Sequence, residues 1–371
     1  MTDKKEMIKN SIYKASLMLP LCISLAVCGG LPSFYGLIVA LIGAVLLHIS
    51  PETDLSPTLL LFLVFLYANS VIGKEALPLC GIAGVAVCLI ILAVRPLKKK
   101  LAESFSIGSL SLMTALFVTV FVTNSYFGIG AEGNTIIEML KSYRSLGFHP
   151  NWRGILYGTI VMVVMITFPR KFKKGTKIVA APFYALVITY ILNLLLVSNK
   201  SIHPFPELGK PELKFSFDLS VITSLNAKAI IVIALSGIAA GIIFAYVLAK
   251  SESTGKAIIS ASASNAVSSV FGFPAAATGN TDSQGFVSGA IAAVMIAAVS
   301  VPTLIFARLP VSSAAVILIV AGWQNLDKQA IKTAFKKPLA IIGFLIAISV
   351  SAIYFPAAGV IIALLFSIIT G

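Results

Sequence analysis

The chain has 371 residues, of which 58% are hydrophobic and only 11% are charged, and its formal net charge is +14. Soluble domains carry about 25% charged residues, so this composition excludes a soluble globular protein. The excess positive charge lies in short clusters beside long apolar runs, which argues against nucleic-acid binding and indicates an all-α polytopic membrane protein.

Fourteen apolar segments follow one another along the chain. Most are about 18–22 residues long, the length that an α-helix needs to cross a bilayer. We expect transmembrane segments at approximately 11–30, 33–49, 56–73, 77–95, 105–125, 152–169, 177–198, 228–249, 255–271, 280–287, 288–307, 310–323, 337–354 and 356–370. We expect no soluble domain, so residues 1–371 form a single transmembrane transport domain.

Basic residues cluster beside alternate segments. Lys4, Lys5, Lys9 and Lys14 precede the first segment, and further clusters follow the fourth, the sixth and the twelfth. Because Lys and Arg accumulate on the cytoplasmic side, this pattern predicts a multi-pass protein of the cell inner (plasma) membrane with both termini in the cytoplasm. The longer connections, 126–151 and 199–227, then lie outside, the first with an amphipathic helix that starts at Thr135.

Two segments are interrupted. The third opens with Pro57 after the polar run 50–56. The tenth, 280–287, is too short to cross a bilayer and overlaps the end of the polar stretch FGFPAAATGNTDSQG at 271–285. Irregular backbone at membrane depth must face protein or a water-filled cavity, because lipid cannot hydrogen-bond to it. Broken helices of this kind form the substrate sites of transporters.

The two interruptions occupy matching places in the two halves of the chain. Fourteen segments divide into seven plus seven, so segment 3 corresponds to segment 10, and an odd number of segments inverts one half relative to the other. This pattern is typical of a 7+7 inverted repeat, with repeats at about 11–198 and 228–370. Half-helices 3 and 10 are then predicted to start near the bilayer midplane.

Two helix starts aimed at one point can bind an anion, because each carries about half a positive charge and several unpaired N–H groups. The residues at these starts are also favoured helix N-caps, and capping alone is the alternative interpretation. Ser236 and Gly237 of segment 8 either line the same cavity or allow close helix packing. The candidate substrate-binding residues are Leu55, Ser56, Pro57, Thr58, Thr278, Gly279, Asn280, Thr281, Ser236 and Gly237.

Asp282 is the one acidic residue in the polar stretch before segment 10. An ionisable side chain at membrane depth is a candidate functional group. We expect Asp282 to be the ion-coupling residue that holds Na⁺ or a proton. The alternatives are a helix cap or a position in a water-exposed vestibule.

Several stretches together resemble the SulP (sulfate permease) family. They are Leu31-Pro32-Ser33-Phe34-Tyr35-Gly36 after segment 1, Asp54-Leu55-Ser56-Pro57 before segment 3, Phe271-Gly272-Phe273-Pro274 with Thr278-Gly279 before segment 10, and Leu309-Pro310 with Asn325-Leu326-Asp327 around segment 12. The likeness covers nearly the whole chain, as a membrane domain without the STAS domain that many members carry. It implies a uracil-permease-like fold with core and gate domains, and a homodimer formed through the gate domain.

The sequence departs from that family at charged positions. Ser283 stands where an arginine often closes the segment 10 motif, and Ala240 stands where members often have a glutamate in segment 8. These departures leave the substrate charge and the coupling mechanism open.

The sequence thus predicts a secondary active transporter that moves a small anion of the sulfate, bicarbonate or carboxylate class by alternating access, with Na⁺ or H⁺ as candidate coupling ions. A nucleobase-type permease or an anion channel of the same fold are the alternatives. No GxSxG, HExxH or P-loop pattern is present, so we expect no enzyme, no cofactor and no metal site. The expected partners are the anion, the lipid bilayer and a second copy of the chain, and not nucleic acid.

Overall fold

The regular elements of the described chain are helices. The computed structural model describes residues 4–46, 55–104, 107–129, 133–147, 149–171, 178–195, 226–250, 264–265, 267–268, 285–300, 309–334, 336 and 338–370. The helices are α1 (Lys4–Cys28), α2 (Ser33–Leu46), α3 (Ser56–Ile72), α4 (Leu77–Ala93), α5 (Arg95–Ser104), α6 (Ile107–Phe127), α7 (Ile136–Leu146), α8 (Trp152–Lys171), α9 (Ala181–Leu195), α11 (Ala227–Lys250), α13 (Gly285–Ser300), α14 (Val311–Gln324), α15 (Lys328–Ala334), α16 (Pro338–Ile353) and α17 (Pro356–Thr370). The predicted all-α class is confirmed.

Most predicted segment boundaries agree with these helices. Helices α3, α4, α8, α11 and α17 each start within one residue of the predicted position. The expected amphipathic helix in the 126–151 connection is α7, whose cap Thr135 accepts a hydrogen bond from the backbone N–H of Glu138 while the Glu138 side chain bonds back to the cap. The structure adds two helices that were not predicted, α5 and α15.

One predicted boundary is wrong. Helix α13 runs without a break from Gly285 to Ser300, through the expected junction between segments 280–287 and 288–307. The residues at that junction are small, and a β-carbon added at Gly289 would lie only 2.4 Å from the Ala44 carbonyl oxygen of α2. Small residues let membrane helices approach closely, so here they mark a packing contact and not the end of a helix.

Three described helical stretches are long and apolar enough to cross a membrane, namely Lys4–Cys28, Leu110–Phe127 and Ala227–Ala249. Helix α4 with the start of α5 makes a fourth candidate, although the two are bent by 104°. The other apolar helices of the described residues are shorter, at 10–17 residues. This content agrees with a multi-pass membrane protein.

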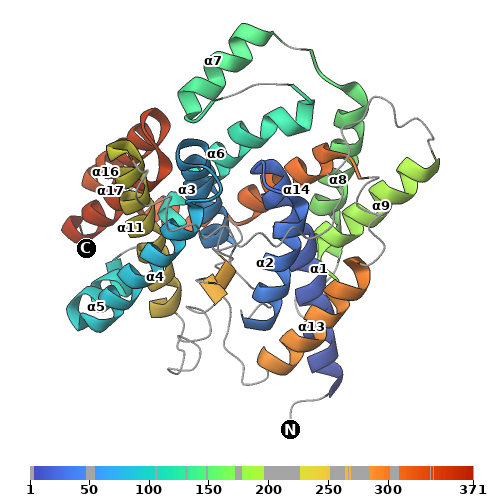
Figure 1. Ribbon diagram of the computed structural model, residues 1–371, viewed down its shortest axis with the longest axis horizontal. Coiled ribbons are helices and arrows are strands. Elements are labelled where there is room, and N and C mark those ends of the chain that lie inside the picture. The colour runs from blue at the N-terminus through green and yellow to red at the C-terminus, as the bar shows by residue number, and fades with distance from the viewer. Residues whose placement is uncertain are drawn as a thin grey trace.

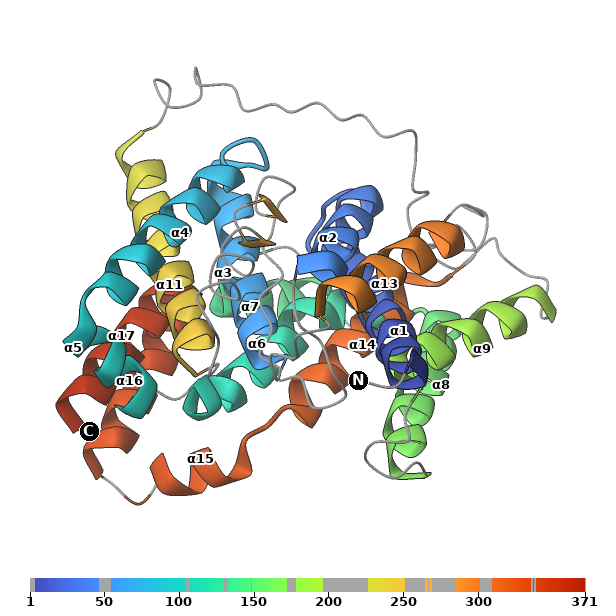
Figure 2. The same ribbon diagram turned by 90° about the horizontal axis from the view of Figure 1, so that it is seen from below.

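The helices form two groups that lie side by side. Helices α3, α4, α5, α11, α16 and α17 pack together on the left of Figure 1, and α1, α2, α8, α9, α13 and α14 pack together on the right. Figure 2 shows the same division from below, and α6 contacts members of both groups. Helix α7 lies at the top of Figure 1, whereas the N-terminus and α5 lie in its lower half, so the two amphipathic helices α5 and α7 are at different ends of the bundle.

Candidate functional site

The structure describes part of the predicted site. Leu55, Ser56, Pro57 and Thr58 at the start of α3 lie within the described residues, as do Ser236 and Gly237 of α11. The segment 10 residues Thr278, Gly279, Asn280, Thr281, Asp282 and Ser283 lie outside them. The predicted meeting of two half-helices therefore stays a prediction.

Helix α3 starts inside the protein. Ser56 and Thr58 are only 3% and 4% exposed. Its 17 residues give a length of about 25 Å at 1.5 Å per residue, short of the hydrocarbon core of about 30 Å. Pro57 lies in the first turn, where its missing N–H removes no helical hydrogen bond. The sequence thus produces a short membrane helix with a buried, electropositive start.

The N-cap of α3 is Leu55, and its side chain offers no cap. The capping interpretation of Ser56 is therefore wrong, because Ser56 is one residue inside the helix and its hydroxyl bonds elsewhere. The acceptor comes from another helix: the Leu55 N–H donates to Asn325 Oδ1 at 3.4 Å, and Ser56 Oγ donates to the Asn325 backbone oxygen at 3.2 Å. Asn325 immediately follows α14.

The end of α14 is thus held against the start of α3. Asn325 is itself oriented by a hydrogen bond from its Nδ2 to the Ala321 oxygen at 2.7 Å. The C-terminal end of a helix carries partial negative charge and the N-terminal end partial positive charge, so the two ends attract each other. Sequence reasoning noticed Asn325 only as part of a family-like motif and gave it no role.

Three further hydrogen bonds fix this end of α14. Trp323 Nε1 donates to Thr119 Oγ1 of α6 at 3.0 Å, and Gln324 Nε2 donates to the Met165 oxygen of α8 at 2.9 Å. The Asp327 N–H donates to Ser111 Oγ of α6 at 3.3 Å. Asn325, whose oxygen atoms accept hydrogen bonds from the start of α3, is therefore held in place by hydrogen bonds between the end of α14 and helices α6 and α8.

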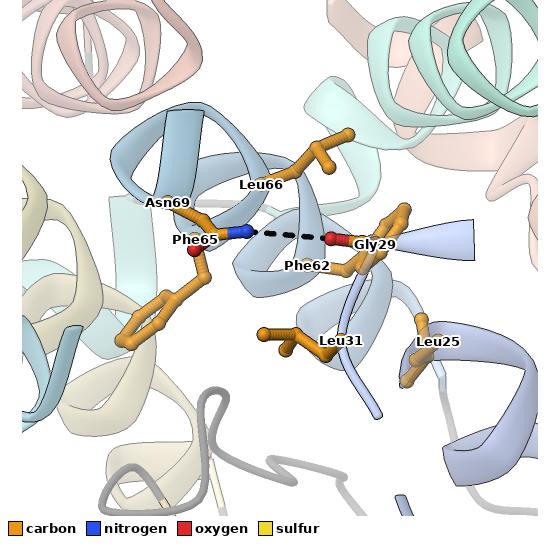
Figure 3. A pocket seen from close by; sticks show the side chains of 7 residues that line it. All are labelled: Leu25, Gly29, Leu31, Phe62, Phe65, Leu66 and Asn69. Carbon is orange, nitrogen blue, oxygen red and sulfur yellow. Dashed lines mark hydrogen bonds between the residues drawn. The ribbon is translucent and has the colours of Figure 1, made fainter. Parts of the chain in front are cut away.

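The C-terminal end of α3 contacts the turn between α1 and α2. Gly30 has φ +69°, the Leu31 N–H donates to the Ala26 oxygen and the Gly30 N–H donates to the Val27 oxygen, which is a Schellman helix end. Asn69 Nδ2 of α3 donates to the Gly29 oxygen of this turn at 3.4 Å, as Figure 3 shows. The small cavity drawn there has a volume of about 10 Å³, room for at most one water molecule, so it does not hold substrate.

Helix α11 approaches α4 through small residues. A β-carbon added at Gly237 would lie 2.5 Å from Ala83 Cβ, and one added at Gly241 would lie 2.5 Å from Val87 Cβ. Gly237 is therefore in close contact with Ala83 of α4 and has no room for a larger side chain. A β-carbon at Gly84 would lie 2.8 Å from Ala240 Cβ, so the side chain at the expected glutamate position faces α4, where a carboxylate has no room.

Ser236 differs from its neighbour Gly237. Its hydroxyl is fully buried and has no hydrogen-bond partner among the described residues. Buried hydroxyls are usually bonded, so this one is available to a ligand or a water. Of the two predicted α11 residues, Ser236 has a hydroxyl that can form a hydrogen bond in the wall of a polar cavity, whereas Gly237 packs against Ala83 of α4.

Contrary to the prediction from the charge pattern, Lys14 does not precede the first membrane helix. Lys14 lies within α1, is fully buried, and its Nζ donates to Ser288 Oγ of α13 at 2.9 Å. A buried lysine inside a membrane helix is costly and normally faces the bundle interior. The signal was present, since Lys14 falls inside the predicted range 11–30.

Comparison with solved structures identifies the fold. The transmembrane domain of BicA, a bicarbonate transporter from a cyanobacterium, matches with a TM-score of 0.67 at 16% identity, over 96% of this chain and 97% of that one. Murine Slc26a9, an anion transporter in the inward-facing state, matches with a TM-score of 0.65 at 12% identity, over 100% of this chain and 69% of that one. A second SLC26A9 structure matches with a TM-score of 0.60 at 12% identity, over 99% of this chain and 65% of that one.

These matches confirm the expected resemblance at the level of fold, over nearly the whole chain. Neither a protein-family model nor a curated protein sequence matches this chain. The shared architecture therefore persists at sequence identities of 12–16%.

Proposed function

We propose that this protein is a secondary active transporter that moves a small anion across the membrane by alternating access. The observation that carries the proposal is the buried start of α3, a membrane helix whose first turn faces the interior of the bundle. The shared fold supports it, since one neighbour is a bicarbonate transporter and another an anion transporter. A transport role also fits a chain without an enzyme motif.

The start of α3 supplies the chemistry for anion binding. Its N–H groups and the Ser56 hydroxyl are donors at the positive end of a helix dipole, which is a favourable place for an anion without any Arg or Lys. In the present structure the Leu55 N–H and the Ser56 hydroxyl bond to oxygen atoms of Asn325, which are neutral acceptors. An anion forms stronger, charge-assisted hydrogen bonds with the same donors, so we propose that it replaces or shares the contacts of Asn325.

The remaining parts of the mechanism rest on the sequence. We propose that Thr278, Gly279, Asn280 and Thr281 complete the anion site from the second half of the chain, with Ser236 in the wall. Asp282 is the proposed ion-coupling residue, with Na⁺ or H⁺ as the ion. The proposed setting is an inner (plasma) membrane with both termini in the cytoplasm, and the proposed assembly is a homodimer.

A thermal-shift screen of the purified protein tests the proposal. Sulfate, bicarbonate, carboxylates and nucleobases are each added with and without Na⁺, and a ligand that binds the folded protein must raise its melting temperature. The proposal expects an anion to do so. Stabilisation by a nucleobase alone would overturn the choice of substrate class.

Uptake into proteoliposomes tests the carrier mechanism. A carrier saturates with substrate and is accelerated by substrate on the opposite side, whereas a channel gives currents without saturation or counterflow. The Asp282→Asn variant should lose the dependence of uptake on the coupling ion. An ion dependence that is unchanged in this variant would remove Asp282 from the coupling role.

A further inference from the structure

Helix α5 is an amphipathic helix at the lower left edge of the bundle in Figure 1. It carries four cations, Arg95, Lys98, Lys99 and Lys100, and one acid among its side chains, Glu103. Arg95, Lys99 and Lys100 are exposed, and Lys98 is half-buried. Leu101 is 1% exposed and Leu97 is partly buried against the core. One face of α5 is thus fixed to the bundle and the other presents positive charge.

The orientation of α5 follows from the sequence at its start. Pro96 has no N–H to donate to the preceding turn and its ring clashes with that turn, so α4 cannot continue straight through it, and Pro96 lies instead in the first turn of α5. Val94, between the two helices, has the extended conformation φ −89°, ψ 92°. The resulting bend between α4 and α5 is 104°, so if α4 crosses the membrane, α5 lies in the plane of its surface.

The surface of α4 places the hydrocarbon boundary close to α5. Ile82, Leu89 and Ile90 of α4, and Val94 directly after it, are 43–62% exposed, and they form an apolar surface that lipid covers in a membrane helix. This apolar surface ends at Val94, and the exposed cations begin at Arg95. The change from apolar to basic within one residue is what the boundary between acyl chains and head groups requires.

We propose that α5 is a binding site for the head groups of anionic phospholipids. Lys99 and Lys100, with Arg95, face the phosphate groups of the adjacent leaflet while Leu101 anchors the helix, and each basic residue near such a surface contributes about 1 kcal/mol. Helix α5 contacts α4, α11 and α17, so lipid bound there also stabilises the bundle. This inference does not depend on the identity of the transported substrate.

The test uses the full-length protein in mixed micelles of neutral detergent with increasing mole fractions of phosphatidylglycerol, or of phosphatidylcholine as the neutral lipid. The readout is the mole fraction that gives half of the maximal rise in melting temperature. The variant K99Q/K100Q removes two exposed cations and keeps good helix formers. The matched control K141Q/R144Q removes two exposed cations from α7 at the other end of the bundle.

Phosphatidylglycerol should raise the melting temperature of the wild type more than phosphatidylcholine does. In K99Q/K100Q the half-maximal mole fraction should increase by about 30-fold, because two cations at about 1 kcal/mol each are lost. K141Q/R144Q should respond like the wild type, and 0.5 M NaCl should weaken the wild-type response by screening.

Three results would overturn the proposal. Equal stabilisation by phosphatidylcholine would show that the lipid charge is irrelevant. Equal losses in the α5 and α7 variants would show that only net charge matters. Equal stabilisation by inorganic phosphate at the same concentration would show that the site takes a free anion and not a lipid.

Discussion

The contact between Asn325 and the start of α3 gives the sharpest prediction. Asn325→Asp keeps the oxygen that accepts from the Leu55 N–H and adds a full negative charge at the positive end of the helix. Both variants lose the bond from Nδ2 to the Ala321 oxygen, and Asn325→Ala also removes the acceptor of the Leu55 N–H. The hydrogen bond from Ser56 to the Asn325 backbone oxygen is retained in both variants.

Both variants should be less stable than the wild type without anion. Asn325 is the C-cap of α14, so Asn325→Asp places its charge at the negative end of α14 as well as at the positive end of α3, and these two effects oppose each other at about 0.3–1 kcal/mol each. The bond to the Ala321 oxygen is lost in both variants at a cost of about 1 kcal/mol, and Asn325→Ala also loses the bond to the Leu55 N–H.

Anion affinity should separate the two variants. Two negative charges about 6 Å apart repel each other by about 3 kcal/mol at an effective dielectric constant of about 20, so Asn325→Asp should lose about 100-fold in affinity. Asn325→Ala leaves the N–H groups of the helix start open to the ligand and should bind at least as well as the wild type. A residue with a purely structural role would lower the stability of both variants without separating their affinities.

The assay measures melting temperature with increasing concentrations of the anion found in the screen, at pH 7.5, where an aspartate is ionised. Asn226→Asp is the matched control, because Asn226 Oδ1 accepts from the Ala229 N–H at the start of α11, away from the proposed site. This control should gain stability and keep wild-type affinity. An Asn325→Asp protein that is folded and binds the anion as tightly as the wild type would refute an anion site at the start of α3.

Three further variants test the packing and the buried polar contacts. Ser288→Ala should lower the free energy of unfolding by about 1.5–3 kcal/mol, because it removes a hydrogen bond to the buried ammonium of Lys14, whereas Ser288→Thr should keep most of it in a chemical-denaturation series. Gly241→Ala should cost about 1–3 kcal/mol, since the added methyl would lie 2.5 Å from Val87 Cβ; a melting temperature equal to the wild type would mean that α4 and α11 are not as close as described. Thr135→Ala should destabilise α7 by about 1 kcal/mol by removing its cap, seen as faster amide exchange in residues 136–146, and Thr135→Ser should restore protection.

Much of the fold follows from local sequence. Apolar length gives the membrane helices, and prolines set their starts, as at Pro57 and Pro356, which open α3 and α17. The same local rules explain α5 in retrospect, since Pro96 and the basic residues after it mark a bend and an interfacial helix. The wrong boundary divided one continuous helix, α13, next to Gly289, whose lack of a side chain allows the close contact with α2.

The contacts of the candidate site could be predicted only in part from local sequence. Leu55 to Thr58 were identified because a polar run before a proline interrupts an apolar pattern, which is a local signal. The partner of that helix start, Asn325, lies 270 positions from Leu55 along the chain, and no local pattern connects the two. The same holds for Lys14 and Ser288, which are 274 positions apart.

The sequence alone determined that this chain is a helical membrane protein and where most of its helices start, α3 among them, because these properties depend on apolar length and on the backbone chemistry of proline within a few residues. Only the tertiary structure decided that Asn325 faces the start of α3, that Ala240 and Gly237 are used for packing against α4, and that Lys14 is buried against α13. Those facts depend on which helix surfaces meet, and that choice is a property of the whole bundle and not of any one segment.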